Sequence, residues 1–389
     1  MSSSRAELES VHSPAPAPTS EHDTDKHIRH KLSSSGVVVI RVSVSEKYIV
    51  LSLDDKTIHV FSAAGEPIVV FRDYPQNAWS LALRDDVLLS GEIGGGIRCW
   101  DLAERHLIGS LPGHTETVRA LGFADATTAV SASKDALLKI WDLGTGSCQG
   151  TLSGHGDSIL DLAVVGEYAE SASKDGTAKV WSLREPRNVS TMSGHTGPVY
   201  RVICHSDGIL ERVYTGSMDH DVRIWDLSTG RPLAVLKGHE SLVTHICVSS
   251  CGIDSSAVVT GGADGNIIIW SWQDHSILHM ISKAHEGAVT SLDAGDGHIL
   301  SGGSDGTVKM WDLRTGKLQR RLGMNTEAVW SVSLGRGASQ SHAAIVASAQ
   351  RSSSPVGESH DAVLDVSEPW STSYISGTLN RRAKKLTWE

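Results

Sequence analysis

Histidine, hydroxyl and aspartate residues recur along this chain in a fixed order, which raises the question of what chemistry they could perform. A hydroxyl beside a histidine that a carboxylate orients is an arrangement used in nucleophilic catalysis. Here the set recurs five times in one register, each hydroxyl ten residues and each aspartate six residues before a tryptophan. We therefore interpret it as structural, a buried hydrogen-bond chain from the indole N–H through hydroxyl and histidine to aspartate. The sets are His114, Ser131, Asp135, Trp141; His155, Ser171, Asp175, Trp181; His195, Thr215, Asp219, Trp225; His239, Thr260, Asp264, Trp270; and His285, Ser301, Asp305, Trp311.

The tryptophans also give the period of the repeat. Successive intervals are 41, 40, 44, 45 and 41 residues in the series Trp100, Trp141, Trp181, Trp225, Trp270 and Trp311. A fixed period of about 40 residues is typical of stacked structural units. Each tryptophan lies in a segment such as LLKIWDL or TVKMWDL, whose alternation of apolar and polar residues predicts a half-buried strand. The elements that position the histidines and aspartates are therefore predicted to be strands.

This combination of Gly-His, hydroxyl, aspartate and tryptophan is identified as the WD40 repeat. The resemblance implies an all-β propeller built from four-stranded blades. Two weaker units come before the five full ones. The first ends at Phe61 with Asp55 in the turn, and the second has Tyr74, Ser90 and Gly94 where histidine, hydroxyl and aspartate are expected. We expect these two blades to be the least regular.

The end of the chain contains signals for one more unit. Val329 to Leu334 resembles a first strand, the segment AAIVASA from residue 343 a second, and AVLDVSE around Leu364 and Asp365 a third. We therefore predict an eight-bladed WD40 β-propeller, with seven blades as the alternative if this last unit does not close.

The flanking segments differ from the repeats in composition. Residues 1–30 are rich in Ser, Pro, Ala, His and Asp, and we expect a disordered tail there. The propeller is predicted over 31–368, and a basic tail over 369–389. The cations of that tail are interpreted mainly as a solvated surface, with a nuclear-import or acidic-partner signal as the alternative; they are Arg381, Arg382, Lys384 and Lys385.

Composition excludes several classes of protein. A formal charge of −10 disfavours a broad nucleic-acid surface, and no apolar run is long enough for a membrane span. The five cysteines are scattered without a CxxC pair, so we expect no disulfide framework, no metal site and no cofactor. They are Cys99, Cys148, Cys204, Cys247 and Cys251. A cytoplasmic or nuclear protein, or one found in both compartments, is predicted.

The order of the blades is similar to one WD40 group, the F-box/WD-repeat proteins that select phosphorylated substrates for cullin-based ubiquitin ligases. The similarity runs over about residues 36 to 366 and includes GHTETVRAL, GHTGPVYRV and SDGTVKMWDL. The residue six positions after each Gly-His, or its counterpart, begins the innermost strand near the channel mouth. In that group these ring positions carry Trp, Arg, Arg, Tyr, Ser or Thr, Thr and Trp; here they are Trp79, Arg119, Leu160, Tyr200, Thr244, Thr290 and Trp330.

The resemblance implies a peptide-binding site at this ring. Family arginines that clasp a phosphate correspond here to Arg119, to Leu160 and, just before a turn aspartate, to Lys134. One arginine is thus kept, one is replaced by leucine and one by lysine, which keeps the charge but loses the planar fork. Lys174 could compensate electrostatically. The predicted peptide-binding residues are Arg119, Lys134, Lys174, Tyr200, Trp79 and Trp330.

We predict a non-catalytic protein-interaction scaffold. In the more specific form of this prediction, the scaffold is a substrate receptor for ubiquitin-dependent degradation and recognises acidic or phosphorylated peptides. Its partners would be other proteins and ligase subunits. The roughly 30 residues before the first expected strand are too few for an F-box, however, so we expect a substrate-type propeller without the ligase adaptor: a truncated gene product, a diverged paralogue or a propeller with another task. The alternatives are a general assembly scaffold with no ligase link, and an enzyme with a channel site. The second is disfavoured because the channel positions offer Asp54 as their lone acid.

Overall fold

Each full repeat folds into a four-stranded antiparallel sheet whose strands pair in chain order. The computed structural model describes residues 27–31, 39–72, 74–206, 211–250, 256–323, 328–334, 343–347 and 363–367. These residues contain strands, turns and irregular segments, with no helix long and apolar enough to cross a membrane. The all-β architecture predicted from the alternating segments is what the structure shows.

Seven such sheets, the blades, follow one another along the chain. The first three are β2 (Val39–Val44), β3 (Tyr48–Leu53), β4 (Ile58–Ser62), β5 (Pro67–Phe71); β6 (Ala78–Arg84), β7 (Val87–Glu92), β8 (Ile97–Asp101), β9 (His106–Ser110); and β10 (Val118–Phe123), β11 (Thr128–Ser133), β12 (Leu138–Asp142), β13 (Ser147–Leu152). The next two are β14 (Ile159–Val165), β15 (Tyr168–Ser173), β16 (Thr177–Ser182), β17 (Arg187–Ser193); and β18 (Val199–Ser206), β19 (Glu211–Ser217), β20 (Val222–Asp226), β21 (Pro232–Leu236). The last two are β22 (Val243–Ser250), β23 (Ser256–Gly262), β24 (Ile267–Ser271), β25 (Ile277–Ile281); and β26 (Val289–Gly295), β27 (His298–Gly303), β28 (Thr307–Asp312), β29 (Leu318–Gly323).

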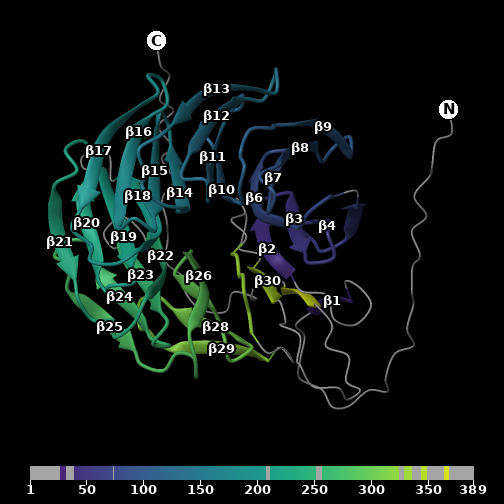
Figure 1. The fold of residues 1–389 in the computed structure, drawn as a ribbon. Coiled ribbons are helices and arrows are strands. Elements are labelled where there is room, and N and C mark those ends of the chain that lie inside the picture. The colour runs from purple at the N-terminus through teal and green to yellow at the C-terminus, as the bar shows by residue number, and fades with distance from the viewer. Residues whose placement is uncertain are drawn as a thin grey trace, which may run out of the picture.

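The blades are arranged around a central channel (Figure 1). The first strand of each blade lies against the first strand of the next, from β2 and β6 round to β22 and β26. These innermost strands therefore line the channel, and the fourth strand of each blade lies outermost. This is the β-propeller that the repeat predicted.

Among the described residues the four-stranded blades number seven, which agrees with the alternative prediction and not with the eight-bladed one. The chain ends contribute a three-stranded sheet instead, in the order β1 (His27–Lys31), β31 (Val363–Ser367), β30 (Ala343–Ala347). Strand β30 lies beside β2 (Figure 1). The segment 329–334, expected as an innermost strand, is irregular and does not pair with β30, so four strands are not assembled here.

Strand β1 corrects the predicted start of the propeller. His27 pairs with Ser367 and Lys31 with Val363, so residues expected in the N-terminal tail belong to a sheet. The sequence HIRHK has a single aliphatic residue, so its composition does not predict a strand. The backbone can still pair, because pairing does not depend on the type of side chain. The rest of the expected N-terminal tail and the basic C-terminal tail lie outside the described residues.

The hydrophobic core lies between neighbouring blades rather than within any one of them. In one cluster Val130 and Ile140 of the third blade pack with Ile159 and Trp181 of the fourth. All six repeat tryptophans are buried, with exposed fractions of 0 to 7%: Trp100, Trp141, Trp181, Trp225, Trp270 and Trp311. Each tryptophan thus joins two sheets, which explains why tryptophan stands where most cores use smaller residues.

One buried carboxyl group predicts a pH dependence of stability. Glu170 on β15 is fully buried, and neither carboxyl oxygen has a hydrogen-bond partner of ordinary geometry among the described residues. Burial, reinforced by the nearby Glu211 carboxylate, raises the pKa of Glu170 from 4.5 to about 8. Between pH 4.5 and about pH 8 the folded protein holds a proton on Glu170 that the unfolded chain releases. This group therefore lowers the free energy of unfolding as the pH rises.

Glu170→Gln is therefore expected to be more stable than the parent near pH 8, with the difference disappearing below about pH 4.5. The difference should grow by up to about 1.4 kcal/mol per pH unit across that window. Urea unfolding followed by circular dichroism at several pH values measures it. Glu185→Gln, at an exposed position, is the matched control. A difference that does not change with pH would contradict a protonated Glu170.

Candidate functional site

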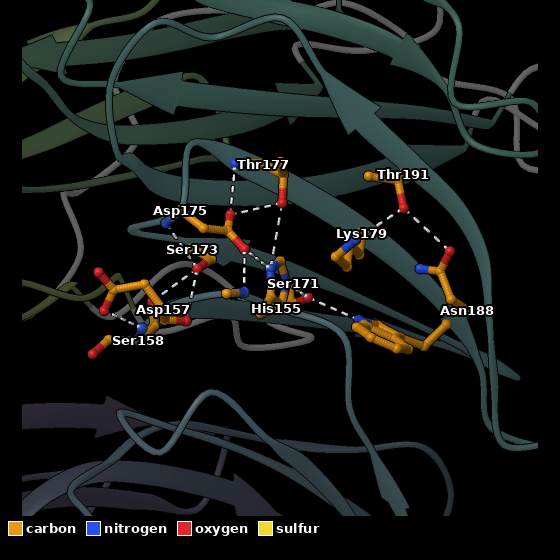
Figure 2. Close-up of polar contacts among 12 residues, drawn as sticks. His155, Asp157, Ser158, Ser171, Ser173, Asp175, Thr177, Lys179, Asn188 and Thr191 are labelled. Atoms are coloured by element: carbon orange, nitrogen blue, oxygen red, sulfur yellow. Dashed lines mark hydrogen bonds and ion pairs between the residues drawn. The ribbon is translucent and has the colours of Figure 1, made fainter.

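The histidine, hydroxyl, aspartate and tryptophan sets meet as hydrogen-bond chains within the third to seventh blades. In the fourth blade Trp181 Nε1 donates to Ser171 Oγ at 2.8 Å, and His155 contacts Ser171 Oγ at 2.7 Å and Asp175 at 2.9 Å (Figure 2). The other four blades repeat these contacts at 2.7 to 3.0 Å. Since the indole can only donate, one consistent direction runs from indole to hydroxyl, to His Nε2, and from Nδ1–H to the carboxylate.

These chains have no access to a substrate. The five hydroxyl residues have exposed fractions of 0%, and the histidine side chains are at most 1% exposed. Burial lowers the pKa of His155 below its ordinary value, which keeps the ring neutral. Burial alone would raise the pKa of Asp175, but hydrogen bonds from Thr177, Gly156 and His155 lower it to about 2. The arrangement stabilises the blade and leaves no free nucleophile.

The second blade keeps a shortened version of the chain. Tyr74 Oη lies 2.9 Å from Ser90 Oγ, which also accepts from Trp100 Nε1 at 3.3 Å. Arg98 pairs with Glu92 at 2.9 Å and lies over the Tyr74 ring. The first blade has Phe61, which has no N–H, in place of tryptophan. The lower regularity predicted for these two blades is thus limited to the hydrogen-bond chain, whose residues are replaced. Their strand pairing is complete.

A β-bulge lies in the innermost strand of each of the seven blades. Six of the seven bulged residues are predicted ring positions; the seventh is Ile40, whereas the ring residue Trp330 lies in the irregular segment 329–334. In the third blade Val118 pairs with Ser133 and Ala120 with Ala132, so Arg119 is the extra residue. In each of the other six blades the same shift in register leaves one residue of the innermost strand without a pairing partner on the second strand. The bulged residues are Ile40, Trp79, Arg119, Leu160, Tyr200, Thr244 and Thr290. A bulge redirects a side chain out of the regular alternation, and this places the whole series at the channel.

A cavity of about 510 Å³ lies at the end of the channel where the bulged residues are found. All seven bulged residues line it, and so does Trp330, whose exposed fraction is 46%. The structure thus brings together four of the six predicted peptide-binding residues, Trp79, Arg119, Tyr200 and Trp330. Thr244 donates its hydroxyl to backbone carbonyls of β23 and β26, and Thr290 to those of β27 and of the irregular segment 329–334, so both hold the wall together.

Arg119 is the predicted cation that reaches the cavity. Its guanidinium lies 5.0 Å from the Trp79 ring, a cation–π contact, and its Nε is buried without a hydrogen-bond partner among the described residues. Burial lowers the pKa of Arg119, and the neighbouring Arg201 acts in the same direction. An acceptor group from a ligand would therefore satisfy a donor that the described protein leaves unpaired.

Lys134 and Lys174 lie beside the mouth and do not line the cavity. Both are exposed, in turns whose backbone N–H groups donate to Thr117 and Ser158 just before the inner strands. Lys174 also lies 3.8 Å from Asp157. Their part in binding stays a prediction, since the pattern located their turns but not the direction of their side chains.

A second set of polar residues in the cavity was not predicted from the sequence. Arg41, Arg201 and His245 also line it, each one residue after a bulge. Arg201 pairs with Asp161, itself the residue after a bulge, at 3.4 Å. Of the two arginines, a signal was available only at Arg201, which directly follows the ring position Tyr200, since Arg41 follows Ile40, a bulged residue outside the predicted ring.

Metal ligation has no support in the part of the chain that the structure describes. There, no cluster of histidine, cysteine and carboxylate side chains is suited to a metal ion. His245, near Cys247 in sequence, instead contacts the Arg201 guanidinium. Cys251 lies outside the described residues.

Comparison with known families agrees with this geometry. The family model described as "WD domain, G-beta repeat" matches residues 105–142, 146–182, 186–226, 230–271 and 276–312, which together make up half of the chain. The chain belongs to the WD40 repeat family. WD40 propellers are generally non-catalytic and generally bind other proteins.

Individual relatives of this WD40 protein have varied names. U3 small nucleolar RNA-associated protein 15 of Schizosaccharomyces pombe is 28% identical over 32% of this chain and 26% of its own length. The CCR4-associated factor 4 homolog of Candida glabrata is 36% identical over 18% of this chain and 14% of its own length. The chain therefore matches only a small part of these relatives. The crystal structure of the computationally designed Ika8 protein superposes with a TM-score of 0.73 at 25% identity, covering 86% of this chain and 98% of that one.

Proposed function

We propose that this WD40 propeller binds acidic or phosphorylated peptides at the mouth of its channel. The observation that carries the proposal is the Arg119 guanidinium, which lines the cavity beside Trp79 with no hydrogen-bond acceptor among the described residues. A charged donor that is partly buried and unpaired favours an anionic ligand, because the ligand removes the cost of an unsatisfied group.

Aromatic residues around Arg119 suit the rest of a peptide. Trp79, Tyr200 and Trp330 line the same cavity and offer flat apolar surfaces beside the cation. Aromatic and arginine side chains in a pocket are the residue types that dominate binding energy at protein interfaces. The formal charge of the whole chain is −10, so a local cationic hollow would also select the site at which an acidic segment docks.

The ubiquitin-ligase part of the predicted function has no support from the matched family or from the relatives named above. Our proposal therefore extends to peptide recognition and not to a role in degradation. Affinity purification with mass spectrometry tests the ligase link separately, through the presence or absence of cullin-ligase subunits.

Binding to an array of short peptides tests the proposal. Each peptide is present in an acidic, a phosphorylated and an uncharged amide form. We expect the propeller to retain the anionic forms preferentially, and Arg119→Glu to lose that preference because it places a carboxylate beside the ligand.

Arg187→Glu is the matched control. Arg187 lies exposed at the start of the outermost strand β17, so the same change of charge is made away from the channel. Equal retention of charged and uncharged peptides by the parent would overturn the proposal, as would an equal loss in Arg119→Glu and Arg187→Glu.

A further inference from the structure

The residues that directly follow the bulges form a second layer, one position further along the innermost strands than the bulged residues. In chain order they are Arg41, Ser80, Ala120, Asp161, Arg201, His245 and Ser291. Three of them, Arg41, Arg201 and His245, line the cavity together although they come from three different blades. This layer contains two guanidinium groups that the ring of peptide-binding residues does not include.

The positive charges of this layer meet across the channel. Arg41 lies close enough to Arg201 and Arg119 that, with burial as the larger cause, their charges lower its pKa to about 10. The carboxylates nearby are Asp54, which lines the cavity, and Asp161. Asp161 is engaged, since one oxygen pairs with Arg201 and the other accepts from the backbone N–H of Val202 at 3.0 Å. Three guanidinium groups thus face two carboxylates, which leaves an excess positive charge in the hollow.

Hydrogen-bond donors are in excess as well. Arg41 donates through Nε to the carbonyl of Trp79 at 3.3 Å, and no described residue accepts from its two terminal nitrogens. Arg201 donates to His245 Nε2. Because a guanidinium has no lone pair to offer, Nε2 must be the acceptor and the imidazole proton must lie on Nδ1. His245 Nδ1 is buried without a partner among the described residues, so it is an N–H that lacks an acceptor.

We propose that Arg41, Arg201 and His245 form a binding site for a free tetrahedral oxyanion such as phosphate, one layer deeper in the channel than the peptide-binding ring. Such an anion supplies what this layer lacks, a negative charge and several acceptor oxygens. The terminal nitrogens of Arg41 would bind two of its oxygens in the planar, two-point manner that guanidinium groups favour. Arg201, already held by Asp161 and in contact with His245 Nε2, would add charge without having to move.

Isothermal titration calorimetry with inorganic phosphate, at an ionic strength held constant with chloride, tests this site. The parent is expected to bind one phosphate saturably. Arg41→Gln should weaken binding about tenfold to a hundredfold, since a charge-assisted contact is lost. Arg41→Lys keeps the charge and loses the planar guanidinium group. Its affinity for phosphate should lie between those of the parent and of Arg41→Gln. Arg41 is chosen because it makes one backbone contact, whereas Arg201 holds Asp161 and His245.

A control variant and a second ligand complete the experiment. Arg187→Gln, at the exposed start of β17, should bind phosphate as the parent does, and thermal melting establishes that each variant is folded. A phosphorylated peptide titrated alongside distinguishes a free anion from a phosphate carried on a chain. Absence of saturable phosphate binding, unchanged affinity in Arg41→Gln, or binding of the phosphopeptide alone would each overturn the free-anion site. The proposal does not depend on peptide binding at the mouth, so either one can fail while the other holds.

Discussion

Replacing Trp181 by alanine is expected to lower the free energy of unfolding by about 3 to 5 kcal/mol. Trp181 is 1% exposed and packs with Ile159 of its own blade and Val130 and Ile140 of the third blade. Its removal opens a cavity between two sheets and also takes the indole donor from Ser171. Urea unfolding followed by circular dichroism measures the loss without relying on the fluorescence of the deleted residue.

Trp181→Phe separates packing from hydrogen bonding. Phenylalanine fills much of the space but has no N–H, so the expected loss is about 1 to 2 kcal/mol. The first blade has Phe61 at the equivalent position, with the apolar Leu51 ten residues earlier where other blades have a hydroxyl. Unfolding curves of Trp181→Ala and the parent that coincide would show that tryptophan does not join the blades as described.

Replacing Leu160 by arginine is expected to strengthen binding of a phosphorylated peptide over its unphosphorylated twin by about tenfold to a hundredfold. Leu160 is the bulged residue of the fourth blade and lines the cavity, so a guanidinium there would face the ligand. One added charge-assisted contact to phosphate accounts for the size of the gain. Peptides retained on the array provide the probe, and fluorescence anisotropy gives both affinities.

Leu160→Gln is the control for this gain, because it adds a polar side chain of similar size without charge. We expect it to leave the ratio of the two affinities near that of the parent. If neither the parent nor Leu160→Arg prefers the phosphorylated peptide, the site does not recognise phosphate.

The regular parts of this propeller could be predicted from the sequence because their constraints are local. A strand with alternating residues, a turn aspartate and a histidine that satisfies a buried hydroxyl repeat at nearly constant spacing, so one register serves five blades. The same register also located most of the ring, since counting from Gly-His or its counterpart gave six of the seven residues that the structure shows as bulged. Arg119 and Tyr200 could thus be placed at the channel from sequence alone.

The remaining features depend on contacts that no spacing encodes. Strand β1 is held by backbone pairing with β31, far away in the sequence, and its composition gives no signal. The second layer depends on the bulge, which brings the next residue to the channel as well, against the alternation expected of a regular strand. The spacing of the repeat therefore does not single out Arg41 and Arg201. Lys134 was located in its turn, but a long flexible side chain does not reveal from sequence where it points.

Titration of the most strongly retained anionic peptide against the parent and Arg119→Glu tests the proposed role of the channel mouth most directly. Fluorescence anisotropy at low and at physiological ionic strength is the measurement. We predict that the parent binds at both, more weakly at the higher ionic strength because exposed charges are screened, and that Arg119→Glu does not bind measurably at either. Affinity of Arg119→Glu equal to that of the parent would contradict recognition at this cavity.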